Sequence, residues 1–336
     1  MLFDLYYHIA AARPQKRKII ARKGAYHGIT IASASLTGID GFHKGFGIPL
    51  DGFLHVSAPH YYKNGLEGET EDEFTTRLAL ELEQLILKEG PDTIGGFFAE
   101  PVMGAGGVIV PPMDYFAKIQ PILKKYDILF VVDEVICGFC RTGNYWGTQT
   151  FNIEPDMLTC AKALSAAYFP ISAILMNDKV YQQLADQTAA LGAFGHGFTY
   201  GGHPVGAAVA LATIKIYDED NILSHVREVS PLLQQGFKRL GDHPLVGNVR
   251  GIGLLGALEF VADKKSKKAF DPAVKVSFKV MDSLRSKGVL LRALGDSLVC
   301  SPPLIIGEED ISTILSSLEQ TLDEVYKSVR EEGHLA

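Results

Sequence analysis

The sequence predicts an α/β protein in which a mostly parallel sheet flanked by helices is followed by a smaller α+β domain. Three features lead to this prediction. Short apolar runs alternate with helical patterns over residues 18–176. One run, ILFVVD at residues 128–133, is apolar almost throughout, as in strands of a sheet that is covered on both faces. After Pro204 this alternation gives way to a different pattern.

The expected strands and helices of the first part alternate along the chain. Apolar runs bounded by turns predict strands, and apolar residues at helical spacing predict helices. Strands are expected at residues 18–22, 53–57, 94–100, 128–133, 157–161 and 171–176. Helices are expected at residues 70–88 and 114–126. Ligands of such a sheet bind at the carboxyl ends of its strands, so the residues that follow these strands are the first candidates for a site.

The last part of the chain forms a second unit in this prediction. It begins with a Gly- and Ala-rich helix at about residues 205–217, followed by another helix and the strand pattern GLLGALEFVA. A helix at residues 272–287, short strands and a final helix from Glu308 complete it. We therefore expect a large domain at residues 1–212 and a small domain at residues 213–336.

The bulk composition is that of a globular protein. Of the 336 residues, 47% are hydrophobic and 21% charged, which suffices for a sizeable core. The formal net charge of -7 provides no basic field for nucleic acid, and the basic run at residues 264–268 is expected to be a solvated turn. Residues 187–214 contain no Asp, Glu, Lys or Arg, but they include Gly-His-Gly, Gly-Gly-His-Pro and several hydroxyl groups, so no membrane helix is expected.

The cysteines argue against a disulfide framework. There are 4 of them in a chain of 336 residues, which favours a reducing compartment, and we expect a cytoplasmic protein. Cys137 and Cys140 form a C-x-x-C pair, but no second pair or histidine cluster completes a zinc site. We expect two buried thiols and no metal there.

The densest chemical signal is the segment ILFVVDEVICGF at residues 128–139. Its apolar run ends in Asp133 and Glu134, so at least one carboxylate is expected at the carboxyl edge of the sheet. A buried carboxylate is costly unless a cation meets it. Taken alone, Asp133 could equally be a structural residue that caps a turn.

Lys162 is the second chemical signal, because it is the only charged residue between Asp156 and Asp178. A lysine in such a segment either extends its ammonium group to water or is desolvated, and desolvation makes the amine a better nucleophile. An aspartate that ends one strand and a lysine just after the next suit a pyridoxal phosphate site. The lysine forms a Schiff base with the cofactor, and the aspartate keeps the pyridine nitrogen protonated.

Six motifs in order along the chain resemble the class III (omega) aminotransferases of fold type I. They are YHG at 26–28, AEPVMGAGG at 99–107, VVDEVICGF at 131–139, CAKALSAAYFP at 160–170, HGFTYGGHPVG at 196–206 and LRALGDSLVCSPPL at 291–304. The resemblance extends from Tyr6 to the C-terminus. It is greatest to the branch that uses pyruvate as amino acceptor, which includes omega-amino acid and 4-aminobutyrate transaminases.

The resemblance implies a cofactor role for several matching residues besides Lys162 and Asp133. Tyr26, next to His27 and Gly28, is expected to lie over one face of the pyridoxal phosphate ring, with Val135 against the other face. By the same resemblance, Thr199 is expected to donate its hydroxyl to the cofactor phosphate of the partner subunit. A complete site would therefore require a homodimer.

The resemblance also implies how substrates are bound. Arg292 is similar to the mobile arginine that grips a substrate carboxylate and swings away for substrates without one. Glu100 is expected to pair with Arg292 when the arginine is not needed. The implied reaction moves an amino group from an omega-amino acid or amine to a keto acid, with pyruvate as the expected acceptor, and the Lys162 amine transfers the proton.

Other interpretations remain open. The glycine-serine cup that holds the cofactor phosphate in the family lies upstream of Met1, so the chain is expected to be truncated relative to the family. It could then be an inactive fragment that keeps the fold and binds the cofactor weakly. A racemase or aminomutase would share every residue named. A nicotinamide dehydrogenase is disfavoured, because the glycines at 104, 106 and 107 lack the G-x-G-x-x-G spacing and two prolines follow at 111 and 112.

Overall fold

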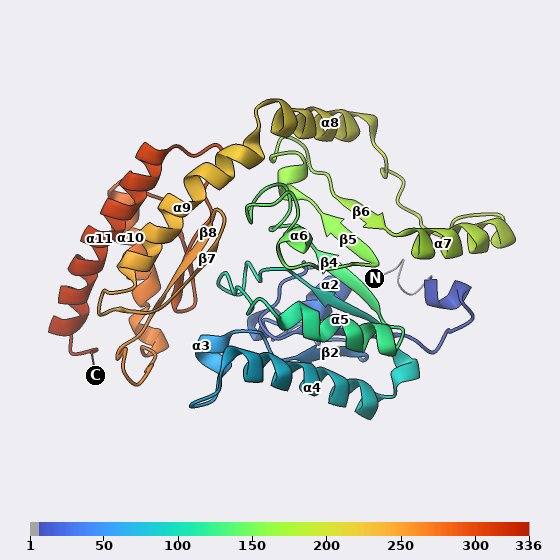
Figure 1. The fold of residues 1–336 in the computed structure, drawn as a ribbon, viewed down its shortest axis with the longest axis horizontal. Helices are drawn as coiled ribbons and strands as arrows, with labels where there is room; N and C mark the ends of the chain where they lie inside the picture. Colours follow the sequence, from blue (N-terminus) through green and yellow to red (C-terminus); the bar gives the residue numbers. More distant parts are fainter. Residues whose placement is uncertain (1–6, 336) are drawn as a thin grey trace. The chain divides into compact units, whose positions relative to one another are not determined.

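The computed structural model describes residues 7–335 and divides into two compact units (Figure 1). The first unit contains the chain up to Gly104 together with Pro111–Phe139 and Trp146–Ile216. The second contains Ala105–Val110, Cys140–Tyr145 and the chain from Tyr217 onward. The two short segments that belong with the second unit have no counterpart in the sequence pattern. One lies between β3 (Ile94–Ala99) and α5 (Tyr115–Lys125), and the other lies between β4 (Leu129–Asp133) and α6 (Gly147–Thr150).

The first unit is built on a six-stranded sheet with strand order β2-β1-β3-β4-β5-β6. Its strands are β1 (Lys18–Arg22), β2 (Phe53–Val56), β3 (Ile94–Ala99), β4 (Leu129–Asp133), β5 (Met157–Cys160) and β6 (Ala173–Met176). All neighbouring pairs are parallel except β5 and β6, which are antiparallel. The predicted mostly parallel sheet is confirmed, and each strand lies where the apolar runs predict it.

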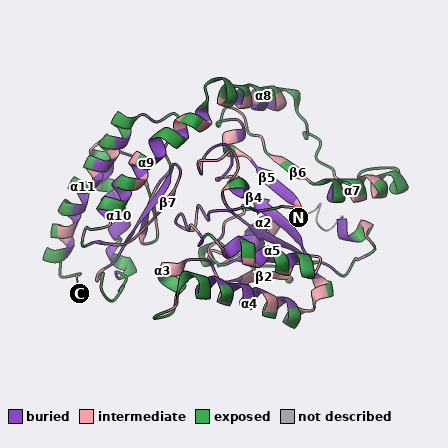
Figure 2. Cartoon of the chain, viewed as in Figure 1, coloured by how far each residue is buried: buried purple, intermediate pink, exposed green. Residues whose placement is uncertain are grey.

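The first unit has seven α-helices among the described residues. They are α2 (Ile31–Leu36), α3 (Tyr61–Asn64), α4 (Glu71–Glu89), α5 (Tyr115–Lys125), α6 (Gly147–Thr150), α7 (Asp178–Leu191) and α8 (Pro204–Glu219), the last of which continues into the second unit. Of these, α2, α4 and α5 pack on the strands. In α4, Thr70 and Glu73 form a capping box, and the apolar face bears Phe74, Leu82 and Ile86, all fully buried. Figure 2 shows β4 and β5 largely buried, whereas much of α4 and α5 is exposed.

The parallel register brings several strand ends to one edge of the sheet. Val132 of β4 pairs with Ala99 of β3, and Asp133 pairs with Thr159 of β5. Every residue of β4 before Asp133 is buried, so the strand is fixed by burial on both faces. Residues that follow β1, β3, β4 and β5 are thereby directed toward the same edge.

The second unit has an antiparallel sheet of order β7-β8-β10-β9. Its strands are β7 (Val246–Ile252), β8 (Leu255–Phe260), β9 (Arg292–Leu294) and β10 (Ser297–Cys300). Its long helices are α9 (Ile222–Leu240), α10 (Val276–Ser286) and α11 (Glu308–Glu331). Leu233, Phe237, Leu258, Leu318 and Leu322 are among the buried side chains that form its core.

Candidate functional site

A pocket lies in the first unit at the carboxyl edge of the parallel sheet. It is lined by residues that follow β1, β3, β4 and β5, namely Tyr26, His27, Gly28, Glu100, Asp133, Val135, Ile136 and Lys162. The structure therefore brings together every expected site residue of this unit except Thr199. Ile136 was not among the expected residues.

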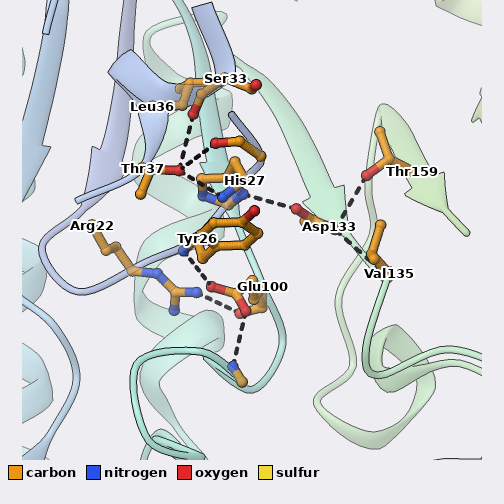
Figure 3. Close-up of polar contacts among 12 residues, drawn as sticks. Arg22, Tyr26, His27, Ser33, Leu36, Thr37, Glu100, Asp133, Val135 and Thr159 are labelled. Carbon is orange, nitrogen blue, oxygen red and sulfur yellow. Dashed lines mark hydrogen bonds and ion pairs between the residues drawn. The ribbon is translucent and has the colours of Figure 1, made fainter. Parts of the chain in front are cut away.

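Asp133 is held by hydrogen-bond donors on both carboxylate oxygens (Figure 3). Its Oδ1 accepts from the Val135 backbone N–H at 3.1 Å and from the Thr159 hydroxyl at 3.4 Å. Its Oδ2 lies 2.8 Å from Nδ1 of His27. Asp133 thus caps the turn after β4, as one interpretation of the sequence allowed, and also presents a fixed carboxylate to the pocket.

His27 is the side chain that joins the loop after β1 to Asp133. Its side chain is only 4% exposed. A carboxylate accepts only, so Nδ1 must carry the proton of this contact. The other ring nitrogen, Nε2, is buried and has no hydrogen-bond partner among the described residues. Buried polar atoms without a partner are uncommon in folded proteins, which marks this part of the pocket as one suited to a polar ligand.

Glu100 is fully buried beneath the pocket and fixes two backbone segments. Its Oε1 accepts from the Tyr26 N–H at 3.2 Å, and its Oε2 accepts from the Gly104 N–H at 2.9 Å. Its backbone carbonyl accepts from the buried guanidinium of Arg22. Burial raises the pKa of Glu100, and the charge of Asp133 raises it further, against the opposing effects of His27 and Arg22.

Gly104 is required at its position by close packing. A Cβ atom there would overlap Cδ1 of Ile136, which lines the pocket. The absence of a side chain at Gly104 therefore allows the turn after β3 to approach the segment after β4. Ile136 thus lies against Gly104 and lines the pocket, and no feature of the sequence singled it out.

Lys162 follows β5 directly and begins a short 3-10 helix, Lys162–Leu164. Its backbone has φ 43°, in the left-handed region that side-chain-bearing residues seldom adopt. Such strained positions cluster at functional sites. Its side chain lines the pocket, and the residue is exposed in the single chain. Of the two environments that the sequence allowed, Lys162 therefore has the one in which the ammonium group reaches water.

Thr199 and Arg292 lie elsewhere. Thr199 is exposed in the segment between α7 and α8, beside Phe198 and Tyr200, whose side chains are 72% and 83% exposed. Arg292 is exposed at the start of β9 in the second unit. Its expected pairing with Glu100, a residue of the first unit, stays a prediction.

Glu134 is a second buried carboxyl group next to Asp133. It accepts from the backbone N–H groups of Gly147 at 2.9 Å and Thr148 at 2.6 Å, at the start of α6. Burial raises its pKa to about 7 despite these bonds. Of the two carboxylates that the sequence places at the end of β4, Asp133 lines the pocket and Glu134 serves the framework.

Comparisons with known proteins show the family of the chain and its fold. The chain matches the family model for aminotransferase class-III over residues 3–322. It is 49% identical to gamma aminobutyrate transaminase 1, mitochondrial, of Solanum lycopersicum, over 97% of this chain and 63% of that relative. A solved transaminase with L-alanine superposes with a TM-score of 0.96 at 49% identity, covering 98% of this chain and 77% of that one.

A second solved structure, the omega transaminase from Pseudomonas jessenii in complex with PMP, is 48% identical with a TM-score of 0.96. The match covers 98% of this chain and 72% of that one. The chain spans 63% of the length of the curated tomato relative.

Proposed function

Since the chain belongs to the class-III aminotransferase family, we propose that it is a pyridoxal-phosphate-dependent transaminase acting on an omega-amino acid or amine. The observation that carries this proposal is the meeting of Asp133 and Lys162 in one pocket, at the ends of neighbouring strands. A carboxylate and a primary amine from adjacent strand ends are the pair that this cofactor requires.

The other groups of the pocket also fit the flat ring of pyridoxal phosphate. Tyr26, Val135 and Ile136 offer aromatic and aliphatic surface for a flat ring. The buried, unpartnered Nε2 of His27 lies on the side chain that holds Asp133, where a polar ligand would be accommodated. When bound, the cofactor supplies an electron sink for the carbanion formed at the substrate carbon.

Each residue of the pocket has a definable task in the proposed reaction. Asp133 holds a proton on the ring nitrogen of the cofactor, and its bond to His27 keeps Oδ2 in place. The Lys162 Nζ would form the covalent bond to the cofactor and, when the substrate amine takes its place, would accept and return the substrate proton. Tyr26 and Val135 would lie against the cofactor ring.

The proposed acceptor is pyruvate. The motifs resemble the pyruvate-using branch of the family, and one similar structure was solved with L-alanine, whose amino group leaves pyruvate behind. Arg292 is the proposed partner of the substrate carboxylate, with Glu100 as its alternative partner. The burial that raises the pKa of Glu100 also makes an approaching cation a favourable partner for this carboxyl group.

The proposed assembly is a homodimer in which Thr199 contacts the cofactor of the partner subunit. Large apolar side chains are exposed along residues 168–216, and Figure 2 shows that α7, α8 and the segment between them are largely exposed. These side chains are Tyr168, Ile174, Leu175, Tyr181, Leu191, Phe194, Phe198, Tyr200, Val205, Leu211 and Ile216. Exposed apolar surface of this extent is typical of an interface between chains.

A cytoplasmic location remains our prediction, although the tomato relative is named mitochondrial. All four cysteines are free and buried, as a reducing compartment allows. Within the described residues, no helix has both the length and the apolar character needed to cross a membrane.

The proposed function is tested by following alanine formation from 4-aminobutyrate and pyruvate with pyridoxal phosphate in excess. The parent chain should form alanine, and Lys162→Ala should form none, because no substitute for the amine lines the pocket. Lys88→Ala, on the exposed face of α4, is the matched control and should resemble the parent. Equal turnover by Lys162→Ala and the parent would refute the proposed role of Lys162.

A further inference from the structure

We propose that Thr37, which does not line the pocket, is a positioning residue for His27 and, through it, for Asp133. This inference rests on the proposed function in one respect, the use of Asp133 by the cofactor. The interaction itself belongs to the folded chain and can be measured without the cofactor. Figure 3 shows the connection from Thr37 through His27 to Asp133.

The hydroxyl of Thr37 lies among three backbone groups of one loop. It accepts from the N–H of His27 at 3.0 Å, and it lies 3.2 Å from the Gly28 carbonyl and 3.0 Å from the Ser33 carbonyl. A hydroxyl has a single proton, so it donates to one of these carbonyls at a time. In either state it accepts from His27, because that bond uses a lone pair.

Thr37 can hold the loop because it is itself anchored. Thr37 is fully buried and lies at the C-terminal end of α2. The neighbouring Gly38 accepts from Gly24 at 2.7 Å and donates to Ala25 at 2.8 Å, so the two ends of the loop are joined. A Cβ atom at Gly38 would overlap the carbonyl of Arg22, which shows how closely this segment packs on the end of β1.

The loop between these anchors carries the pocket residues Tyr26, His27 and Gly28. The Tyr26 N–H is held by the Glu100 carboxylate, whereas His27 is held by Thr37. The direction of the His27 ring follows from its backbone position, and the ring is almost completely buried. A shift of this backbone would therefore change the 2.8 Å contact between Nδ1 and Asp133.

The isosteric substitution Thr37→Val removes the hydroxyl and leaves the partly buried N–H of His27 without its acceptor. We expect the dissociation constant for pyridoxal phosphate to rise about tenfold, the effect of one unsatisfied buried group. Binding is read from quenching of Trp146, the single tryptophan of the chain. Thr37→Ser retains the hydroxyl and should bind within about twofold of the parent.

Thr75→Val is the matched control for general loss of stability. Thr75 is also fully buried in the first unit, and its hydroxyl contacts the Asp72 carbonyl at 3.0 Å and the Asp114 carboxylate at 2.7 Å. It belongs to α4 and does not line the pocket. Thr75→Val should lower thermal stability without changing cofactor affinity. If Thr37 were merely structural, Thr37→Val would likewise lower stability and leave the affinity unchanged.

The second measurement uses the chain without cofactor. In protein labelled with ¹⁵N-histidine, the Nδ1–H proton of His27 should give a downfield signal, assigned by its loss in His27→Gln. The signal should persist in Thr37→Ser and disappear or broaden in Thr37→Val. Unchanged His27 signal and unchanged affinity in Thr37→Val would overturn the inference while leaving the proposed function intact.

Two further outcomes are also decisive. If the parent chain does not bind pyridoxal phosphate, the proposed function fails, and the His27 signal still decides the role of Thr37. If Thr37→Val does not fold, amide hydrogen exchange in the parent chain tests the hydrogen bond between Thr37 and His27. The His27 N–H should exchange more slowly than that of exposed Ile29, and equal rates would refute the hydrogen bond to Thr37.

Discussion

Asp133 serves the framework and the pocket with one carboxylate. Through Oδ1 it closes the turn after β4, and through Oδ2 it faces His27. Asparagine can accept with its oxygen, but its amide group would face a donor in place of the second carboxylate oxygen. It also lacks the charge that holds a proton on a ring nitrogen.

Asp133→Asn should therefore keep some cofactor affinity and lose most of its transaminase activity. We expect kcat/KM to fall by more than about tenfold, which corresponds to about 1.4 kcal/mol. The matched control is Asp156→Asn, because Asp156 accepts from the backbone of Phe130 and does not line the pocket. Activity of Asp133→Asn within that tenfold range would reduce Asp133 to a structural cap.

Glu134 makes the stability of the fold depend on pH. Its pKa is raised from 4.5 to about 7 in the folded chain, so the folded state binds the proton more tightly than the unfolded state. The resulting stabilisation is complete below about pH 4.5 and is lost as the pH rises through about 7. From this shift, the free energy of unfolding should decrease by up to about 3 kcal/mol over that interval.

Urea unfolding of Glu134→Gln at pH 5 and pH 8 tests this expectation. The variant should lose less stability than the parent between the two pH values, because the titrating group is gone. Glu228→Gln, at an exposed position on α9, should keep the dependence of the parent. Identical pH dependence in the parent and in Glu134→Gln would exclude Glu134 as the source.

The sequence indicated most residues of the pocket, His27 and Glu100 among them, but not the contacts that orient them. Asp133 and Lys162 were predictable because each follows an apolar strand, where the fold class expects ligands. The contact between His27 and Asp133 joins residues 106 positions apart and required the structure. Nothing in the sequence distinguishes Thr37 from other threonines, since its role comes from the closure of the loop between Gly24 and Gly38.

At the scale of elements, prediction succeeded where burial gives a clear pattern. The strands of the parallel sheet were recognisable from apolar runs, and α4 and α5 from helical spacing. Helix α7 was not predicted, because it buries only Val180 and Leu184 and its apolar pattern is weak. Strand β7 was also missed, because most of its residues are only partly buried and do not alternate.

A buried lysine joins two elements of the first unit. The side chain of Lys16 donates to the backbone carbonyls of Ile94 at 3.1 Å, Tyr126 at 3.0 Å and Asp127 at 3.0 Å. It also lies 3.4 Å from the carbonyl of Pro91. These carbonyls belong to the start of β3 and to the turn between α5 and β4, so one ammonium group links both.

Lys16→Met keeps the aliphatic length and removes the donors of these bonds. Unsatisfied buried carbonyls should lower the free energy of unfolding by roughly 2–4 kcal/mol. Lys88→Met, at an exposed position of α4, should change it by less than about 0.5 kcal/mol. Urea unfolding measures both variants. Equal stability of Lys16→Met and the parent would show that the lysine contributes little to the link.

At the scale of the whole molecule, the proposed substrate gate combines residues of both units. Arg292 belongs to β9 of the second unit, and Glu100 follows β3 of the first. The proposal is that Arg292 binds the carboxylate of pyruvate or alanine, and that Glu100 takes its place as partner for an amine without a carboxylate. Arg292 then matters for substrates with a carboxylate, and Glu100 for amines without one.

Arg292→Ala should weaken kcat/KM for alanine far more than for a carboxylate-free amine, by roughly 2–5 kcal/mol. Glu100→Gln should have the opposite effect: kcat/KM should be nearly unchanged for alanine and reduced for the carboxylate-free amine. Because Glu100 also holds the backbone of Tyr26 and Gly104, the ratio between the two substrates is the informative quantity. Equal losses for both substrates in Arg292→Ala would require the gate to be abandoned.

The proposed attachment of the cofactor to Lys162 can be measured directly. The parent chain is incubated with pyridoxal phosphate, reduced with borohydride, digested and analysed by mass spectrometry. The reduced cofactor should be attached to the peptide containing Lys162, the one lysine among the described residues that lines the pocket with Asp133. Attachment at another lysine, in a chain that forms alanine from 4-aminobutyrate and pyruvate, would contradict the proposed role of Lys162.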